Sequence, residues 1–353
     1  MNLKAALVYT PQELKFGTSG RRGEVVHLTD LEIYINVVGE LEYLQKLPAE
    51  QGGIARGDEF YVGLDLRPSS VRLAAAVQRG IADTGMQPVD MGRIPTPALM
   101  NYAIARGRGS IMVTGSHIPF DRNGYKLNTS RGELLKELEQ PINAAVRGVR
   151  ERVYGEAFER SLFDEHGMFK PSAAAAAYLA RYLDFFGAGA LSGLRLAVYQ
   201  HSAVGRDLLP ELLTRLGADA IPCGRSDQFV PIDTENIEAA QVAKIQELVD
   251  PLGRVDAVVS TDGDSDRPLL LGIENGKVRF FGGDLIGMLV AEFLGADAVV
   301  CRLPAMMPSI ADRSSGCSSR RRRSDRLLWL PEWRWPAAKA GARFVVGRRM
   351  AVS

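Results

Sequence analysis

The sequence predicts an α/β protein built of consecutive layered βαβ domains, and three observations support this fold class. Short apolar runs alternate with helix-like segments through residues 1–155, and the same alternation returns through residues 171–273. Polar or acidic loops directly follow two of the apolar runs, at 114–119 and at 262–267. Strands that alternate with helices form layered sheets, and such sheets carry their sites at the carboxyl ends of the strands.

The first domain is expected to occupy residues 1–155. Apolar residues at helical spacing follow Thr29 and Asp30, either of which would cap a helix, and Gly85 is placed to end another. Strands are expected at 60–66, 87–91 and 110–113, and helices at 29–47, 70–84, 95–106 and 132–154. A polar connector at 158–170 separates this domain from the next.

The second domain is expected at residues 171–273. Its strands are predicted at 194–199, 220–222 and 255–260, and its helices at 171–186, 202–216 and 237–252. An Asn-Gly turn at 275–276 predicts a hairpin between the apolar runs 269–273 and 278–281. Residues 274–301, with a helix at 283–294 and a strand from 298, are expected to begin a third domain.

The loop at 114–119 reads Thr-Gly-Ser-His-Ile-Pro and follows an apolar run. It would display the hydroxyl of Ser116, a candidate nucleophile, next to the titratable ring of His117. A turn at Asn123-Gly124 is expected to bring Lys126 back toward this loop. Each of these residue types alone is more often structural than catalytic. No Ser-His-Asp arrangement, Walker A loop or Gly-x-Gly-x-x-Gly motif is present in the sequence.

A second loop places carboxylates at alternate positions, Asp262, Asp264 and Asp266. Hard oxygen donors at this density suit Mg²⁺ or Ca²⁺, and a solvated acidic turn is the alternative. An EF-hand is excluded because its sixth position requires glycine and is Arg267 here. An arginine beside a metal site indicates a bound anion such as phosphate.

A glycine-punctuated segment at 14–23 is expected to be a loop carrying two arginines, Arg21 and Arg22. A hydroxyl, a carboxylate cluster and an arginine at the ends of different α/β units together favour phosphoryl transfer. That reaction needs an acceptor oxygen, a divalent ion and a path for the proton.

Three segments resemble motifs of the α-D-phosphohexomutases, the phosphoglucomutase/phosphomannomutase superfamily. The loop at 114–119 with 123–126 resembles the phosphoserine loop of that family, 16–23 resembles its amino-terminal motif, and 262–267 resembles its metal loop. The resemblance implies that domains one and two are present. It also implies that Mg²⁺ is held by Ser116 with its phosphate and by Asp262, Asp264 and Asp266.

The implied reaction moves a phosphoryl group between the 1- and 6-positions of a hexose phosphate through phospho-Ser116 and a hexose 1,6-bisphosphate. By the same resemblance, Lys126 and His117 are candidates for proton transfer, and Arg22 and Arg267 would steady charge. The alternative is a metal-dependent phosphotransferase or phosphatase that stops at the phosphoserine. The sequence does not distinguish glucose, mannose and glucosamine phosphates.

The segment 302–353 differs in character from the rest of the chain. It holds twelve Lys and Arg against three Asp and Glu, and all three tryptophans lie within 329–335. It matches neither the sugar loop nor the distal-phosphate loop of the family, so domain three is expected to be incomplete and domain four absent. We expect an aberrant, disordered tail and impaired turnover.

A frameshift near residue 300 would explain this tail. Met306-Met307 has one possible codon pair, ATGATG, and the codon of Pro308 continues it with CC. A shift by one base then yields GAT-GCC, the codons for Asp-Ala, which resembles what family members carry at this point. The sequence favours this explanation over a non-catalytic protein with a basic, nucleic-acid-binding tail.

No apolar run has the roughly 18 residues of a membrane span, so no membrane partner is expected. The short apolar start does not predict a secretory signal. Three scattered cysteines favour the reducing cytoplasm.

Overall fold

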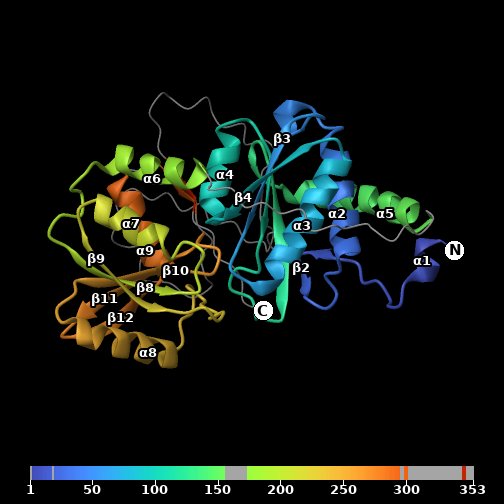
Figure 1. The fold of residues 1–353 in the computed structure, drawn as a ribbon. Coiled ribbons are helices and arrows are strands. Elements are labelled where there is room, and N and C mark those ends of the chain that lie inside the picture. The colour runs from blue at the N-terminus through green and yellow to red at the C-terminus, as the bar shows by residue number, and fades with distance from the viewer. Residues whose placement is uncertain (1, 18–19, 156–172, 295–297, 301–343, 347–353) are drawn as a thin grey trace, which may run out of the picture. The chain divides into compact units, whose positions relative to one another are not determined.

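The computed structural model describes residues 2–17, 20–155, 173–294, 298–300 and 344–346. The chain divides into two compact units, Met1–Phe280 and Phe281–Ser353. The first unit contains two sheets, and each sheet has helices on both faces (Figure 1). The layered α/β class predicted from the sequence is therefore confirmed.

The first sheet is mixed, with strand order β1-β2-β6-β5-β3-β4 and with β7 paired to β6. Its parallel part lies at one end, where β3 pairs with the edge strand β4 and with β5, and the β5–β6 and β6–β2 pairs are antiparallel. The strands are β1 Lys15–Phe16, β2 Arg21–Glu24, β3 Glu59–Leu64, β4 Gln87–Arg93, β5 Ser110–Val113, β6 Arg122–Thr129 and β7 Gly132–Glu133.

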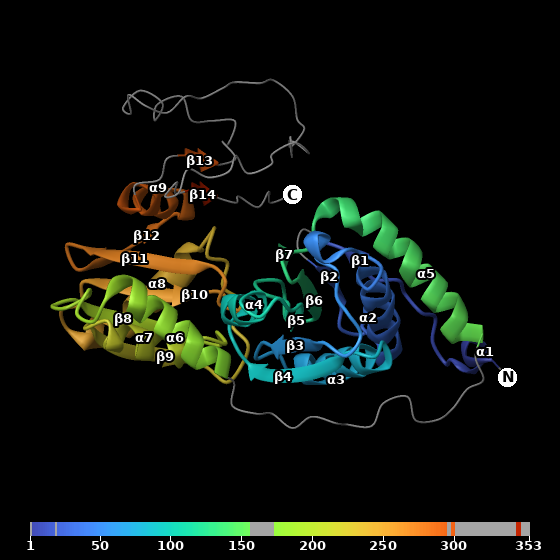
Figure 2. The same cartoon turned by 90° about the horizontal axis from the view of Figure 1, so that it is seen from above.

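Helices α2 and α3 cover one face of this sheet, and α4 packs on the other. Helix α5 lies along the outer side of α2 (Figure 2), where Gly39 permits an approach so close that a Cβ would lie 2.6 Å from Cα of Val146. Thr29 caps α2, since its Oγ1 accepts from the backbone of Glu32. The helices are α1 Leu3–Ala6, α2 Asp30–Leu44, α3 Pro68–Asp83, α4 Thr96–Ile104 and α5 Glu139–Gly155.

Three local expectations for this domain are wrong. Asn123-Gly124 lies inside strand β6 instead of a turn, and Gly124 is needed there because a Cβ would lie 2.0 Å from the carbonyl oxygen of Arg21 on β2. The expected loop at 14–23 contains two paired strands, β1 and β2, and Arg21 and Arg22 of β2 also pair with β6. The helix predicted from residue 132 begins only at Glu139, after β7 and a single 3₁₀ turn at Lys136–Leu138.

The second sheet has strand order β12-β11-β10-β8-β9. Helices α6 and α7 lie on one side of it and α8 on the other (Figure 1). The strands are β8 Arg195–His201, β9 Asp219–Arg225, β10 Ala257–Thr261, β11 Pro268–Glu274 and β12 Lys277–Phe281, and the helices are α6 Ala173–Phe186, α7 Leu208–Arg215 and α8 Ala239–Val249. The chain turns at the Asn-Gly hairpin and returns as β12, so this sheet continues past residue 273. Single 3₁₀ turns occur at Ala49–Gln51 and at Asp250–Leu252.

The second unit contains α9 Gly283–Phe293, β13 Ala298–Val300 and β14 Phe344–Val346. Phe344–Val346 pairs in parallel with β13, in keeping with the high strand preference of Phe and Val. The rest of the tail, with its arginine run and tryptophans, lies outside the described residues. Within the described part of the chain, no helix has the length and apolar character that crossing a membrane requires.

Candidate active site

Ser116 lies two residues beyond Thr114, at the carboxyl end of β5, and is fully buried. Its backbone adopts a positive φ of 53°, which is uncommon for a residue other than glycine. The backbone amide of Ser116 donates to Oγ1 of Thr114 over 2.7 Å, which supports this conformation. Non-glycine residues in such conformations cluster at functional sites.

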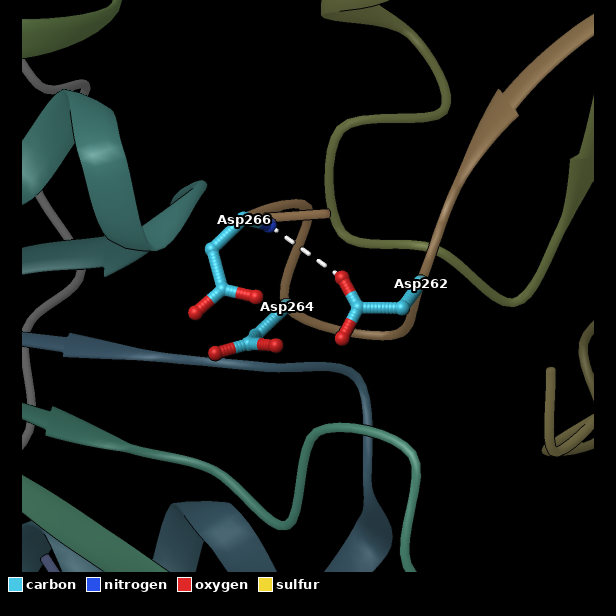
Figure 3. Close-up of side chains that lie close together, drawn as sticks. All are labelled: Asp262, Asp264 and Asp266. Carbon is cyan, nitrogen blue, oxygen red and sulfur yellow. Dashed lines mark hydrogen bonds between the residues drawn. The ribbon is translucent and has the colours of Figure 1, made fainter. Parts of the chain in front are cut away.

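The acidic turn follows β10, and Figure 3 shows its three carboxylates directed toward one region. One oxygen from each of Asp262, Asp264 and Asp266 lies within 4.8 Å of the others. The turn is closed by Oδ1 of Asp262, which accepts from the backbone amides of Asp266 and Arg267 over 3.2 Å each. The alternate spacing in the sequence therefore produces one converging cluster.

The serine loop and the acidic turn are in direct contact. Oγ of Ser116 donates to Oδ2 of Asp262 over 2.6 Å. Lys126 lies beside them because β6 runs antiparallel to β5, and its Nζ donates to Asp264 and Asp266 over 2.7 and 2.6 Å. The two domains thus meet at the residues that the sequence singled out.

Electrostatics separates the buried groups of this cluster. Burial, followed by the charges of Asp264 and Asp266, raises the pKa of Asp262 well above its usual value. Burial alone would raise the pKa of Asp264 as well, but the ammonium of Lys126 and the hydroxyl of Thr96 hold it below its ordinary value. Burial would lower the pKa of Lys126, yet the two carboxylates that it contacts raise it.

The cluster fits a divalent cation. Oδ1 of Asp264 is buried and finds no hydrogen-bond partner among the described residues, although its Oδ2 accepts from Thr96 and Lys126. A buried carboxylate oxygen without a partner is costly unless a cation or water satisfies it. Mg²⁺ and Ca²⁺ prefer oxygen ligands, and either ion would offset the repulsion between the three carboxylates.

The two adjacent arginines of β2 have different environments. Arg21 is buried in the first domain, where it donates to Glu40, Leu14 and Asn143 over 2.6–2.9 Å. Arg22 points the opposite way, because successive strand residues face opposite sides of a sheet. Burial lowers the pKa of Arg22, and the carboxylates of the acidic turn oppose that shift, so Arg22 lies in the field of the site.

His117 and Arg267 also reach this site. Nδ1 of His117 lies 3.3 Å from Oγ of Ser116. Burial, with the charges of Arg267 and Arg22, lowers the pKa of this histidine. Arg267 is held between Glu235, at 3.3 Å, and Asp266, at 3.8 Å. All residues predicted as site residues are thereby brought together.

Sequence reasoning missed three contributors. Thr96, at the start of α4, donates from Oγ1 to Oδ2 of Asp264 over 2.7 Å and from its backbone to the carbonyl of Asp264 over 3.0 Å. Asp65 and Arg67, directly after β3, form hydrogen bonds with the serine loop, to Thr114 and to the carbonyl of Ser116 respectively. The only signal for them was their position at the carboxyl end of predicted strands.

The fold and the site define an α/β protein in which a buried strand-end serine faces an acidic turn suited to a metal ion. The chain matches the phosphoglucomutase/phosphomannomutase family over alpha/beta/alpha domain I at residues 13–153 and over domain II at residues 176–274. The chain belongs to this family.

Two similar proteins are the phosphomannomutases of Sinorhizobium fredii and Salmonella muenchen. They are 38% identical over 290 residues and 36% identical over 293 residues. Each match covers 81% of this chain but only 58% and 55% of the relative, so the chain spans less than two thirds of their length. The crystal structure of a putative phosphomannomutase from Thermus thermophilus shares the fold, with a TM-score of 0.61 and 22% identity over 82% of this chain and 64% of that one.

Proposed function

We propose that this chain is a phosphohexomutase in which Ser116 carries a phosphoryl group between the 1- and 6-positions of a hexose phosphate. The observation that supports this most directly is the contact of 2.6 Å between Oγ of Ser116 and Oδ2 of Asp262. It brings a buried hydroxyl to a cluster of carboxylates that can bring a divalent cation to a phosphate.

In this proposal the Oγ–P bond of phospho-Ser116 breaks while a bond forms from phosphorus to a hydroxyl oxygen of the sugar phosphate. The product is a hexose 1,6-bisphosphate, and its other phosphoryl group later returns to Ser116. Lys126 is the candidate general acid. The two carboxylates that it contacts raise its pKa and keep it protonated, so these contacts would have to pass to a cation before the proton could leave. His117 is neutral near pH 7 because its pKa is lowered, which suits a general base.

Cations would offset the charge of the transferring group. Arg22 and Arg267 lie close enough to influence His117 and are candidates for this role. Asp262, Asp264 and Asp266, with the phosphate on Ser116, would hold Mg²⁺, which supplies further charge stabilisation when bound.

We propose that residues 1–155 and 171–273 act as the phosphoserine and metal domains and that turnover by this chain alone is impaired. Binding energy from remote parts of a substrate is used at the reacting centre. The sequence provides no segment that matches the loops expected to grip the sugar and its distal phosphate. Phosphorylation of Ser116 does not need both orientations of the substrate, whereas a full mutase cycle does.

The test is to incubate the purified protein with Mg²⁺ and glucose 1,6-bisphosphate and to locate phosphate by mass spectrometry. We expect phosphate on Ser116, none in Ser116→Ala, and little conversion of glucose 1-phosphate or mannose 1-phosphate. Steady release of inorganic phosphate without isomerisation would favour the phosphatase alternative. An unphosphorylated Ser116 would contradict the proposal.

A further inference from the structure

Arg67 is a buried guanidinium in the first domain whose donors are directed at the backbone of the serine loop. Its Nη1 donates to the carbonyl oxygens of Pro119 and Arg122 over 2.8 and 2.9 Å. Its Nη2 donates to those of Ser116 and Ile118 over 3.1 and 2.5 Å. One side chain, 2% exposed, thus ties together four carbonyl groups of the segment that turns from β5 into β6.

The same loop is also held from the β3 side by Asp65. Oδ2 of Asp65 accepts from Oγ1 of Thr114 over 2.9 Å and from the amide of Gly115 over 3.2 Å. Its Oδ1 accepts from the backbone amide of Arg67 over 3.0 Å, so the carboxylate also fixes the start of α3. Asp65 and Arg67 together fix both the entry and the exit of the loop.

Gly115 shows how closely the guanidinium lies against the loop backbone. A Cβ at this position would lie 2.5 Å from both Cζ and Nε of Arg67. On its far side the guanidinium is covered by Phe229 of the second domain, with Cζ 4.0 Å from the ring centroid. A cation over an aromatic face is stabilised most where water is excluded.

These contacts matter because Ser116 adopts a conformation that the chain does not favour by itself. A positive φ at a serine persists only when its surroundings determine it. Neither Asp65 nor Arg67 contacts Oγ of Ser116, so their effect on the hydroxyl acts through the backbone. A displacement of about 1 Å of a reacting group can cost about a hundredfold in rate.

We propose that Arg67 is a positioning residue, which holds the Ser116 loop so that Oγ faces Asp262, and that Phe229 keeps the guanidinium in place. This inference rests on the proposed function for its kinetic effect. The planar fork is essential, because a lysine at position 67 would keep the charge but could not reach four carbonyl groups at once.

The test compares Arg67→Lys with Arg21→Lys, a matched change at another buried arginine of the same domain that does not contact the loop. With Mg²⁺ and glucose 1,6-bisphosphate, we expect Arg67→Lys to phosphorylate Ser116 about a hundredfold more slowly than wild type. Amide hydrogen exchange should accelerate in residues 114–122, while Mg²⁺ affinity of the acidic turn stays within about twofold. Arg21→Lys should lower the melting temperature without either local effect.

Chemical rescue provides a readout that a purely structural role would not move. In Arg67→Ala, added guanidinium should recover part of the phosphorylation rate and slow exchange in residues 114–122, whereas methylammonium should do neither. If Arg67→Ala does not fold, Phe229→Leu takes its place, and we expect about a fivefold slower phosphorylation with faster exchange at the same loop.

The outcomes separate this inference from the proposed function. If wild-type Ser116 is never phosphorylated, the proposed function fails, and the exchange measurements still decide whether Arg67 holds the loop. A wild-type phosphorylation rate together with unchanged loop exchange in Arg67→Lys would overturn the inference. An equal rise of loop exchange in Arg21→Lys would overturn it as well, because the effect would then be general destabilisation.

Discussion

Ser116 and Asp262 are 146 positions apart, yet Oγ of the serine donates to Oδ2 of the aspartate over 2.6 Å. This hydrogen bond joins the serine loop of one sheet to the acidic turn of the other. It brings together three carboxylates, an ammonium and a hydroxyl, of which only Asp266 is exposed. The first predictions below follow from the cost of assembling those charges.

Replacing Asp262 by Asn should stabilise the metal-free protein while abolishing its response to Mg²⁺. Like charges on Asp264 and Asp266, added to burial, raise the pKa of Asp262, so its ionised form is disfavoured in the fold. We expect the variant to melt at a higher temperature than wild type in EDTA at pH 7, by an amount worth about 1 kcal/mol. Adding Mg²⁺ should raise the wild-type melting temperature only.

The direction of the pKa shift also predicts a pH dependence of metal binding. Because the raised pKa favours protonated Asp262, Mg²⁺ affinity should fall as the pH is lowered, and binding should release protons. Calorimetry in buffers of different ionisation enthalpy measures that release. Asp219→Asn, at a surface carboxylate of β9, is the control and should release as many protons on Mg²⁺ binding as wild type.

The melting experiment has its own contradicting outcome. Equal melting temperatures for Asp262→Asn and wild type in EDTA would argue against repulsion among the carboxylates of the acidic turn.

Thr96→Val should weaken Mg²⁺ binding by about tenfold with little effect on the fold. The hydroxyl of Thr96 orients Asp264, and valine preserves its shape while removing the donor. Thr84→Val is a matched control, since Thr84 is also buried and donates to a backbone carbonyl, that of Ile81 at the end of α3. Titration of Mg²⁺ followed by calorimetry separates the two variants. Unchanged affinity in Thr96→Val would show that the turn is held without this contact.

Neighbouring arginines should give opposite results when each is replaced by methionine. Arg22→Met is expected to slow phosphorylation of Ser116 by about a hundredfold at a nearly unchanged melting temperature, because it removes a cation near the reacting group. Arg21→Met should instead cost about 3–5 kcal/mol of stability, since Glu40 would remain buried without its cation. Both variants are measured by urea unfolding and by the phosphorylation assay. A large loss of stability in Arg22→Met, or a stable Arg21→Met, would contradict this assignment of roles.

His201 should make the protein sensitive to acid. It is fully buried at the end of β8, and its Nδ1 has no hydrogen-bond partner among the described residues. Burial lowers its pKa to about 4. In the unfolded chain this histidine takes up a proton near pH 6.5, whereas in the folded protein it stays neutral down to about pH 4. Its contribution to the free energy of unfolding is therefore fully present above about pH 6.5 and is lost as the pH falls from 6.5 to 4. The loss attributable to this residue is at most about 3 kcal/mol.

His201→Asn is the variant that checks this effect. Asparagine tolerates the positive φ of 29° and does not titrate, although its shorter side chain gives up the contact that Nε2 makes with the carbonyl of Thr261. We expect the stability difference between pH 7 and pH 4.5 to shrink in this variant, measured by urea unfolding. His27→Gln, at a half-exposed histidine, should leave that difference unchanged. Identical pH profiles for wild type and His201→Asn would exclude His201 as the source.

The source DNA is expected to show a reading-frame shift near the codon for residue 300. The family match in domain II ends at residue 274, and the basic segment beyond 301 resembles no family loop. Restoring the frame should produce a longer protein that interconverts hexose 1- and 6-phosphates. An intact reading frame, with a protein mass that agrees with the printed sequence, would eliminate the hypothesis.

Much of the fold could be predicted from local sequence because its signals are local. Helical spacing and a capping threonine predicted α2, and the apolar run before Ser116 predicted β5. The alternate aspartates of the acidic turn were readable for the same reason, since side-chain chemistry and spacing are properties of the chain itself. The motif order then indicated the family, and comparison with known proteins confirmed it.

Strand pairing and packing between distant segments could not be read in this way. Only the antiparallel pairing of β6 with β2 and β5 shows that Asn123-Gly124 belongs to a strand and that Lys126 reaches the acidic turn. The register of β2 decided that Arg21 is structural and that Arg22 faces the site. No local pattern in the sequence distinguishes these adjacent arginines.

The sequence by itself determined which chemical groups are available for the candidate site: a hydroxyl, three carboxylates, an imidazole, an ammonium and two arginines. The tertiary structure alone decided how they meet and which further residues hold them, among them Thr96 and Arg67. The physical reason is that a contact across 146 or 168 positions depends on the folding of two sheets and their packing, which no window of local sequence contains.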